Sequence, residues 1–119
     1  MSYNKIKTDP VLGKKVHEHL VSVGVETPFT NNGLSREEKM DKIEGNFNQI
    51  LDTLGLDRRD DSLIDTPKRI AKMYVNEIFW GLDYKAFPKA TVVENKMKYN
   101  EMVIVKNISV QSNCEHHFV

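Results

Sequence analysis

The sequence predicts an α+β fold in which helices come first and an antiparallel sheet follows. Apolar residues recur at helical spacing in three segments between residues 10 and 80. After residue 89 the pattern changes to short β-branched runs and to the alternation that is typical of strands. Helices and strands that are segregated along a chain favour this architecture. We therefore expect a helical region over residues 1–88 and the beginning of a sheet-forming domain over residues 89–119.

The first helix is predicted over residues 10–23. Thr8-Asp9-Pro10 supplies a capping side chain and a proline for the first turn. Apolar side chains then follow every three or four positions: Leu12, Val16, Leu20 and Val23. Gly24 ends the helix. His17 and His19 lie within it, and we expect both to face mainly solvent.

The second helix is predicted after a loop over residues 25–34, where proline, asparagine and glycine favour turns. Ser35-Arg36-Glu37-Glu38 has the form of a capping box. The apolar stripe that follows indicates a core-facing side rather than a cofactor site: Met40, Ile43, Phe47, Ile50, Leu51 and Leu54. Gly55 ends the helix.

The third helix is predicted to begin with Thr66 as its cap and Pro67 at its first position, and to run to about Trp80, with Gly81 as its end. Three cations lie near its start, where the helix dipole favours anions: Lys68, Arg69 and Lys72. This arrangement indicates either a phosphate-binding site or an ordinary charged helix surface.

Two strands are predicted after the helices. Thr91-Val92-Val93 is short and β-branched, and residues 102–110 alternate between apolar side chains on one side and mixed ones on the other. The end of the longer strand leads to Cys114. Because a stable sheet needs about three strands or a packing partner, we expect the sheet to be incomplete within this sequence.

The densest group of reactive side chains follows this strand, at residues 112–119. Cys114 and His117 are three positions apart, so a turn lets both bind one Zn²⁺. His116 points in another direction and suits proton transfer near neutral pH. Glu115 either orients an imidazole or faces solvent. Since two ligands do not hold zinc, at least one more must come from another chain or from sequence outside these residues.

Two other interpretations of the same residues stay open. A single cysteine is often a small buried apolar residue, and neighbouring histidines are often surface residues. Alternatively, Cys114 is a nucleophile that a nearby histidine activates by lowering the pKa of its thiol.

The composition limits which classes of binding partner and which cellular compartment we expect. Seventeen Lys and Arg residues balance seventeen Asp and Glu residues, so the net charge is zero, which argues against nucleic acid as a partner. The sequence has no secretory signal and no apolar run long enough for a membrane span. With one cysteine, no internal disulfide forms. We therefore expect a cytoplasmic protein.

Several segments in a constant order resemble the GTP cyclohydrolase I family: Asp61-Ser62-Leu63, Thr66–Tyr74, Glu77-Ile78-Phe79, Gly81-Leu82-Asp83-Tyr84, Glu94-Asn95-Lys96 and Cys114–Val119. The resemblance implies zinc-dependent conversion of GTP and water into 7,8-dihydroneopterin triphosphate and formate, the entry to tetrahydrofolate synthesis. It also implies amino-terminal helices, a tunnelling-fold (T-fold) sheet and a toroidal homodecamer with active sites between subunits.

The resemblance also assigns roles to individual residues. Cys114 and His117 match two of the family's three zinc ligands, His116 matches a histidine implicated in acid and base catalysis, and Arg69 matches a triphosphate contact. The match covers the amino-terminal half of the family, or slightly more. The later cysteine that supplies the third zinc ligand and the glutamate that recognises guanine lie beyond it. We therefore expect the 119 residues alone to be inactive.

Three classes of function remain. The first is the cyclohydrolase, for which a longer reading frame supplies the missing residues. The second is a truncated, non-catalytic relative that acts as an oligomer or interaction subunit. The third is a protein with Cys114 as a metal-free nucleophile, which the adjacent histidine pair makes the weakest of the three.

Overall fold

The computed structural model describes residues 5–26, 29–114 and 116–118. Three α-helices carry the fold in these residues, and shorter helical turns connect and extend them. In chain order the elements are η1 Lys5–Lys7, α1 Pro10–Val23, α2 Arg36–Thr53, α3 Thr66–Met73, the π-helical turn η2 Tyr74–Ile78, and the 3₁₀ turns η3 Trp80–Leu82 and η4 Tyr84–Ala86.

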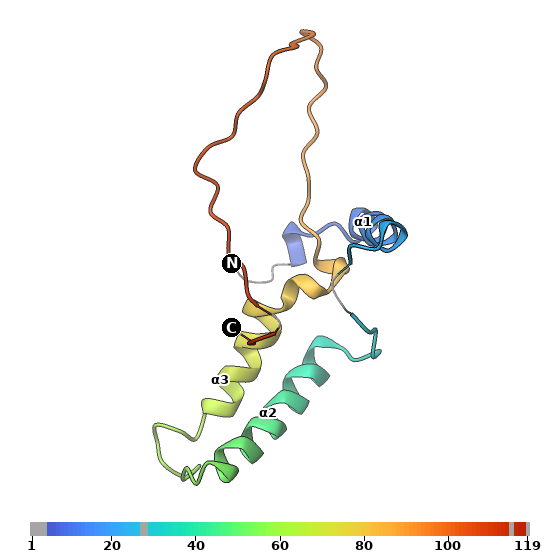
Figure 1. Ribbon diagram of the computed structural model, residues 1–119. Helices are drawn as coiled ribbons and strands as arrows, with labels where there is room; N and C mark the ends of the chain where they lie inside the picture. The colour runs from blue at the N-terminus through green and yellow to red at the C-terminus, as the bar shows by residue number, and fades with distance from the viewer. Residues whose placement is uncertain (1–4, 27–28, 115, 119) are drawn as a thin grey trace.

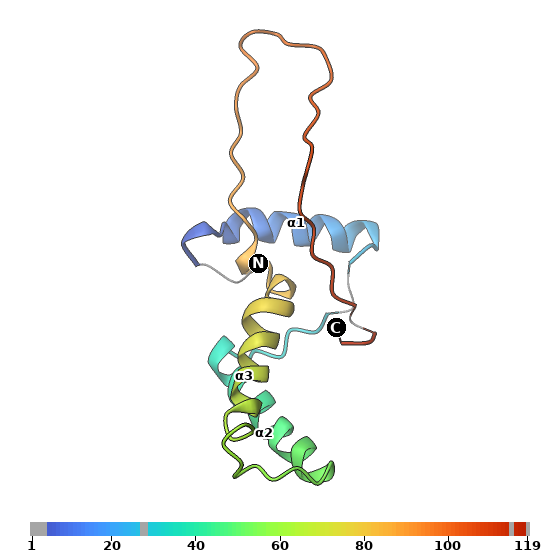
Figure 2. The ribbon, with the colours of Figure 1, turned by 90° about the vertical axis from the view of Figure 1, so that its left-hand side faces the viewer.

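The centre of the fold is an antiparallel hairpin of α2 and α3 (Figure 1). α1 runs across one end of this hairpin (Figure 2) and packs against η4. Buried apolar side chains are few in the described residues: Leu51, Ala71, Val75 and Ala86. The hydrophobic core between the helices is therefore small.

α1 has the predicted bounds, because the signals at its ends are local. The Asp9 carboxylate accepts hydrogen bonds from the amides of Val11 and Leu12, at 3.1 Å and 3.0 Å. Gly24 closes the helix at φ 68°, in the left-handed region that favours glycine. The predicted first helix over residues 10–23 is confirmed.

His17 differs from the prediction, whereas His19 is exposed as expected. The His17 side chain is only 36% exposed, because its ring stacks on Tyr84 at a centroid distance of 4.3 Å. Its Nε2 also lies 2.5 Å from a carboxylate oxygen of Glu26. η4 and the segment after α1 cover this histidine, and helical periodicity alone does not reveal either contact.

α2 begins with the predicted capping box. The Ser35 hydroxyl accepts a hydrogen bond from the Glu38 amide at 3.2 Å, and the Glu38 carboxylate accepts one from the Ser35 amide at 2.7 Å. The hydrogen bond that the Glu38 carboxylate accepts from the Ser35 amide is the main reason why the pKa of Glu38 lies below its ordinary value of 4.5, and the Ser35 side chain lowers this pKa further.

The third helix departs from the prediction at both ends. Its cap is Asp65, and Thr66 is already its first residue. After Met73 the α-helix widens into a π-helical turn, in which the Phe79 amide bonds to the Tyr74 carbonyl at 2.8 Å. The extra residue in this turn brings the Tyr74 and Phe79 rings to a stacked centroid distance of 5.7 Å.

Residues 89–113 leave the helices as a long extended excursion and return to α3 (Figures 1 and 2). In the described part of the chain this segment is exposed and forms no paired strand. The chain accordingly has a radius of gyration of 19.2 Å, against about 13–14 Å for a compact chain of this length. The antiparallel sheet and the boundary near residue 89 stay predictions.

No helix in the described residues combines the length and the hydropathy that are needed to cross a bilayer.

The packing of α1 on η4 leads to a stability prediction. A Cβ atom added at Gly13 would lie 1.8 Å from the Tyr84 carbonyl oxygen, so Gly13→Ala must push α1 and η4 apart. We expect the free energy of unfolding to fall by about 1–3 kcal/mol in urea denaturation. The control is Gly45→Ala in α2, where no described atom lies within 4 Å of such a Cβ. That change should stabilise the protein by about 0.5–1 kcal/mol, and equal effects of the two substitutions would contradict the packing.

The capping box leads to a second stability prediction. Ser35→Ala removes the hydroxyl that caps α2, and we expect the free energy of unfolding to fall by about 1 kcal/mol.

Because the pKa of Glu38 is lowered in the folded protein, the stabilising effect of its carboxylate is present above pH 4.5 and is lost as the pH falls below that value. Glu38→Gln should abolish this acid dependence in pH-resolved urea titrations. Ser22→Ala, on the exposed side of α1, should change stability little.

Candidate metal centre

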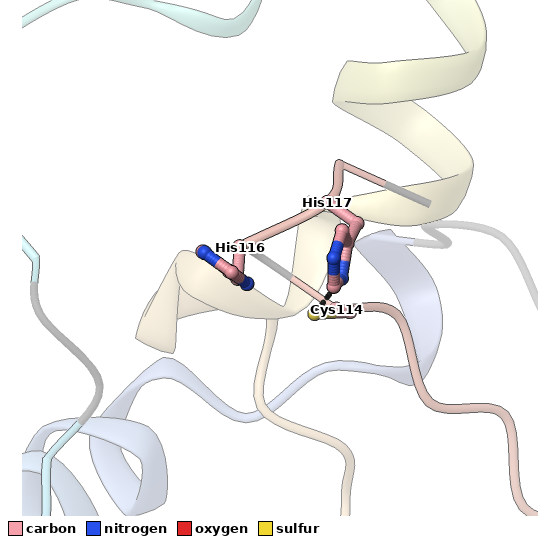
Figure 3. Close-up of side chains that lie close together, drawn as sticks. All are labelled: Cys114, His116 and His117. Atoms are coloured by element: carbon pink, nitrogen blue, oxygen red, sulfur yellow. Dashed lines mark hydrogen bonds between the residues drawn. The ribbon is translucent and has the colours of Figure 1, made fainter.

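A tight turn gathers the predicted ligands at the end of the extended excursion. The Phe118 amide donates a hydrogen bond to the Cys114 carbonyl at 2.8 Å and so closes the turn. Phe118 itself adopts a φ of 65°, in the left-handed region that non-glycine residues seldom occupy. Because the turn is short, the side chains of Cys114, His116 and His117 project from neighbouring points of the backbone (Figure 3).

The donor atoms of these three residues all lie within 4.8 Å of one another. Cys114 Sγ and His117 Nδ1 share a hydrogen bond at 3.4 Å. Two such atoms bound to one tetrahedral zinc ion, at about 2.3 Å and about 2.0 Å, would lie about 3.5 Å apart. The observed separation therefore fits two adjacent positions of a zinc coordination shell.

His116 lies closer to the pair than its place in the sequence suggests. Adjacent residues were expected to point in different directions, yet the His116 and His117 ring centroids lie 4.5 Å apart in an edge-to-face arrangement. The closed turn accounts for this proximity, because it curls successive residues around one point. All three side chains are exposed, so a substrate has access to them.

Phe118 attaches the turn to the helices. Its ring lies 5.6 Å from the Tyr74 ring and 5.0 Å from the Phe79 ring. The Tyr74 hydroxyl donates a weak hydrogen bond to the Phe118 carbonyl at 3.5 Å, and Phe47 of α2 stacks on the other side of Tyr74 at 5.8 Å. These four rings form one aromatic cluster. This role of Phe118 was not predicted from the sequence, although an aromatic residue directly after the histidine pair was a visible signal.

Arg69 and Glu115 are the other residues that the sequence analysis singled out. Arg69 lies in the first turns of α3, and its Nη2 donates hydrogen bonds to the Thr66 hydroxyl at 2.7 Å and to the Ser62 carbonyl at 3.1 Å. Among the described residues, no hydrogen bond or ion pair joins Arg69 to Cys114, His116 or His117. Glu115, predicted either to orient an imidazole or to face solvent, lies outside the described residues.

The turn brings a cysteine and two histidines, residue types that can serve as metal ligands, close together beside a helical hairpin. The sequence identifies the family. The model of the GTP cyclohydrolase I family matches residues 43–119, which include α3 and the whole turn. The chain therefore belongs to the GTP cyclohydrolase I family, a family of hydrolases, and the resemblance found in the sequence is confirmed.

Curated relatives agree with this family. GTP cyclohydrolase 1 of Aeromonas salmonicida is 60% identical over 104 residues, which cover 87% of this chain and 48% of the relative. The protein of the same name from Shewanella loihica is 58% identical over 106 residues, 89% of this chain and 50% of the relative. The protein of the same name from Vibrio campbellii is 60% identical over 106 residues, which cover 89% of this chain and 49% of the relative. The chain thus spans about half the length of these relatives.

The attachment of the turn leads to a prediction about its mobility. Phe118→Ala removes the ring that packs on Tyr74 and Phe79, so we expect the backbone order parameters of residues 114 and 116–118 to fall from about 0.85 toward 0.6 or lower in NMR relaxation. Tyr99→Ala, which removes an exposed aromatic side chain from the excursion, is the matched control and should leave these values unchanged. An equally rigid turn in the Phe118 variant would show that the aromatic cluster does not hold it.

Proposed function

We propose that this chain is part of a zinc-dependent GTP cyclohydrolase I, which converts GTP and water into 7,8-dihydroneopterin triphosphate and formate in tetrahydrofolate biosynthesis. One observation carries the proposal. The match to the family extends through the turn, and in that turn Cys114 Sγ and His117 Nδ1 have the separation of two zinc ligands.

Cys114 and His117 would hold the metal. A thiolate and an imidazole are the donors that zinc prefers, and catalytic zinc sites use about three protein ligands. By resemblance to the family, the third ligand is a cysteine from sequence beyond these residues. The chemistry that bound zinc supplies is the acidification of a water molecule, whose pKa falls toward about 7.

His116 would move protons through its ring nitrogens while the five-membered ring of the purine opens. Histidine is the side chain that most often acts as a general acid and base in enzymes. Its exposed position beside His117 lets it reach a substrate at the turn without displacing either proposed zinc ligand.

Arg69 would bind the triphosphate. Its two observed hydrogen bonds both come from Nη2, so Nε and Nη1 stay available for phosphate oxygens. The start of α3 adds the favourable end of the helix dipole. Arg69 precedes Tyr74 by five positions, which corresponds to about 7 Å along the axis of a helix.

The complete enzyme would be a cytoplasmic homodecamer with active sites between subunits and a T-fold sheet in each subunit. One feature of the described residues supports an assembly. The excursion over residues 89–113 exposes apolar residues and backbone groups that strands of a sheet would pair.

A second candidate function is a non-catalytic relative that joins an oligomer as an interaction subunit. The observation that favours it is the exposed apolar excursion over residues 89–113, which would serve assembly while the turn contributes to a partner's site.

The experiment that separates the two candidates is the intact mass of the native protein, measured together with zinc content and activity. A single polypeptide of about twice 13.7 kDa in the protein from its source, with about one zinc per subunit, supports the enzyme. A single polypeptide of 13.7 kDa supports the interaction subunit. We expect the purified 119-residue chain to form no product, and dihydroneopterin triphosphate formation by that chain would contradict this.

Substitutions in the longer protein test the residue roles. His116→Ala should lower kcat by about 10²–10⁴-fold with little change in zinc content. Arg69→Ala should raise KM for GTP at least tenfold, because a charge-assisted contact to the phosphates is lost. Arg59→Ala is the matched control, since this arginine is 91% exposed in the loop before α3. An Arg59 effect as large as that of Arg69 would overturn the triphosphate assignment.

A further inference from the structure

A groove of about 910 Å³ lies between α2 and the turns that follow α3. Its floor is apolar and largely aromatic: Leu34, Ile43, Phe47, Val75, Phe79 and Trp80. The volume falls within the range of small-molecule sites, about 300–1,000 Å³. Phe118 lines one end of the groove, but Cys114, His116 and His117 do not line it, so the groove is separate from the candidate metal centre.

The charged residues that line the groove are mostly basic. Lys39 and Lys42 lie one turn apart on α2, and Lys85 lies in η4. The guanidinium group of Arg36 donates to the Val75 carbonyl at 3.1 Å and lies 3.5 Å from Asp83, the acidic residue among the lining residues. The groove therefore has an apolar floor and an excess of positive charge at its rim.

Glu38, which does not line the groove, offsets part of this charge. Its carboxylate accepts a hydrogen bond from the Ser35 amide and interacts with Lys42 through space, so an excess of positive charge remains among the lining residues. In the described part of the chain, no ion pair forms at Lys39, Lys42 or Lys85.

We propose that this groove binds a small amphiphilic anion, a carboxylate with a hydrocarbon body. The body lies on the aromatic floor, where burial of apolar surface favours it. The carboxylate lies between the ammonium groups of Lys39 and Lys42, whose flexible stems reach along the groove wall. Charge complementarity decides the sign of the ligand's charge, since the lysines would repel a cationic amphiphile of the same shape.

Trp80 makes the binding measurable. It is the single tryptophan of the sequence and it lines the groove, so its fluorescence reports on occupancy. The probes are decanoate, decanol and decylammonium, titrated into the metal-free chain, with calorimetry as a second readout. We expect saturable binding of decanoate with a Kd of about 1 mM or tighter, and at least tenfold weaker binding of decylammonium. Equal affinities for decanoate and decylammonium would overturn the proposal.

Charge variants locate the site. Lys39→Gln combined with Lys42→Gln should weaken decanoate binding at least tenfold, with unchanged circular dichroism and unchanged binding of decanol. The matched control is Lys14→Gln combined with Lys15→Gln, which removes two exposed lysines from α1, outside the groove. An unaltered decanoate affinity in the groove variant, or an equal loss in the control, would overturn the assignment.

Protein concentration gives a separate test. If a second copy of the chain fills the groove, decanoate affinity will fall as the protein concentration rises, and the assembled form will not bind decanoate. That result would refute the small-anion site. An affinity that is independent of protein concentration supports it, and this readout involves neither zinc nor GTP.

Discussion

The packing of Phe118 against Tyr74 and Phe79 is the interaction on which the candidate metal centre depends. The turn from Cys114 to Phe118 has one internal backbone hydrogen bond and lies after a long exposed excursion. Such a turn does not hold its side chains in one place by itself, because ordering each residue costs about 1–2 kcal/mol of conformational entropy. An aromatic contact that joins it to the helices supplies both attachment and orientation.

The π-helical turn makes that contact available. A regular α-helix places the residue five positions after Tyr74 off to one side, whereas the wider turn stacks Phe79 on Tyr74. π-helical turns are rare and are found disproportionately at functional sites. The same widened segment lines the amphiphilic groove, so the groove and the proposed metal centre share one wall at Phe118.

The described chain exposes more apolar surface than a compact domain does. Val92, Met97 and Met102 are among the side chains of the excursion that are at least 80% exposed. Long exposed apolar segments with free backbone groups are liable to pair with other chains. A sheet completed by further strands would remove that liability, which is the physical reason for expecting an assembly around this segment.

Much of the local structure was predictable from the sequence. The bounds of α1 and the capping box of α2 depend on residues within four positions of one another. Zinc binding by Cys114 and His117 stays a prediction, with their donor atoms 3.4 Å apart. The short sequence motifs also identified the family. Only the tertiary structure decided the burial of His17, the attachment of Phe118 and the existence of the groove. Each of these depends on contacts between segments far apart in the sequence, as in the Tyr74–Phe118 pair at a separation of 44 residues, and no local periodicity encodes such contacts.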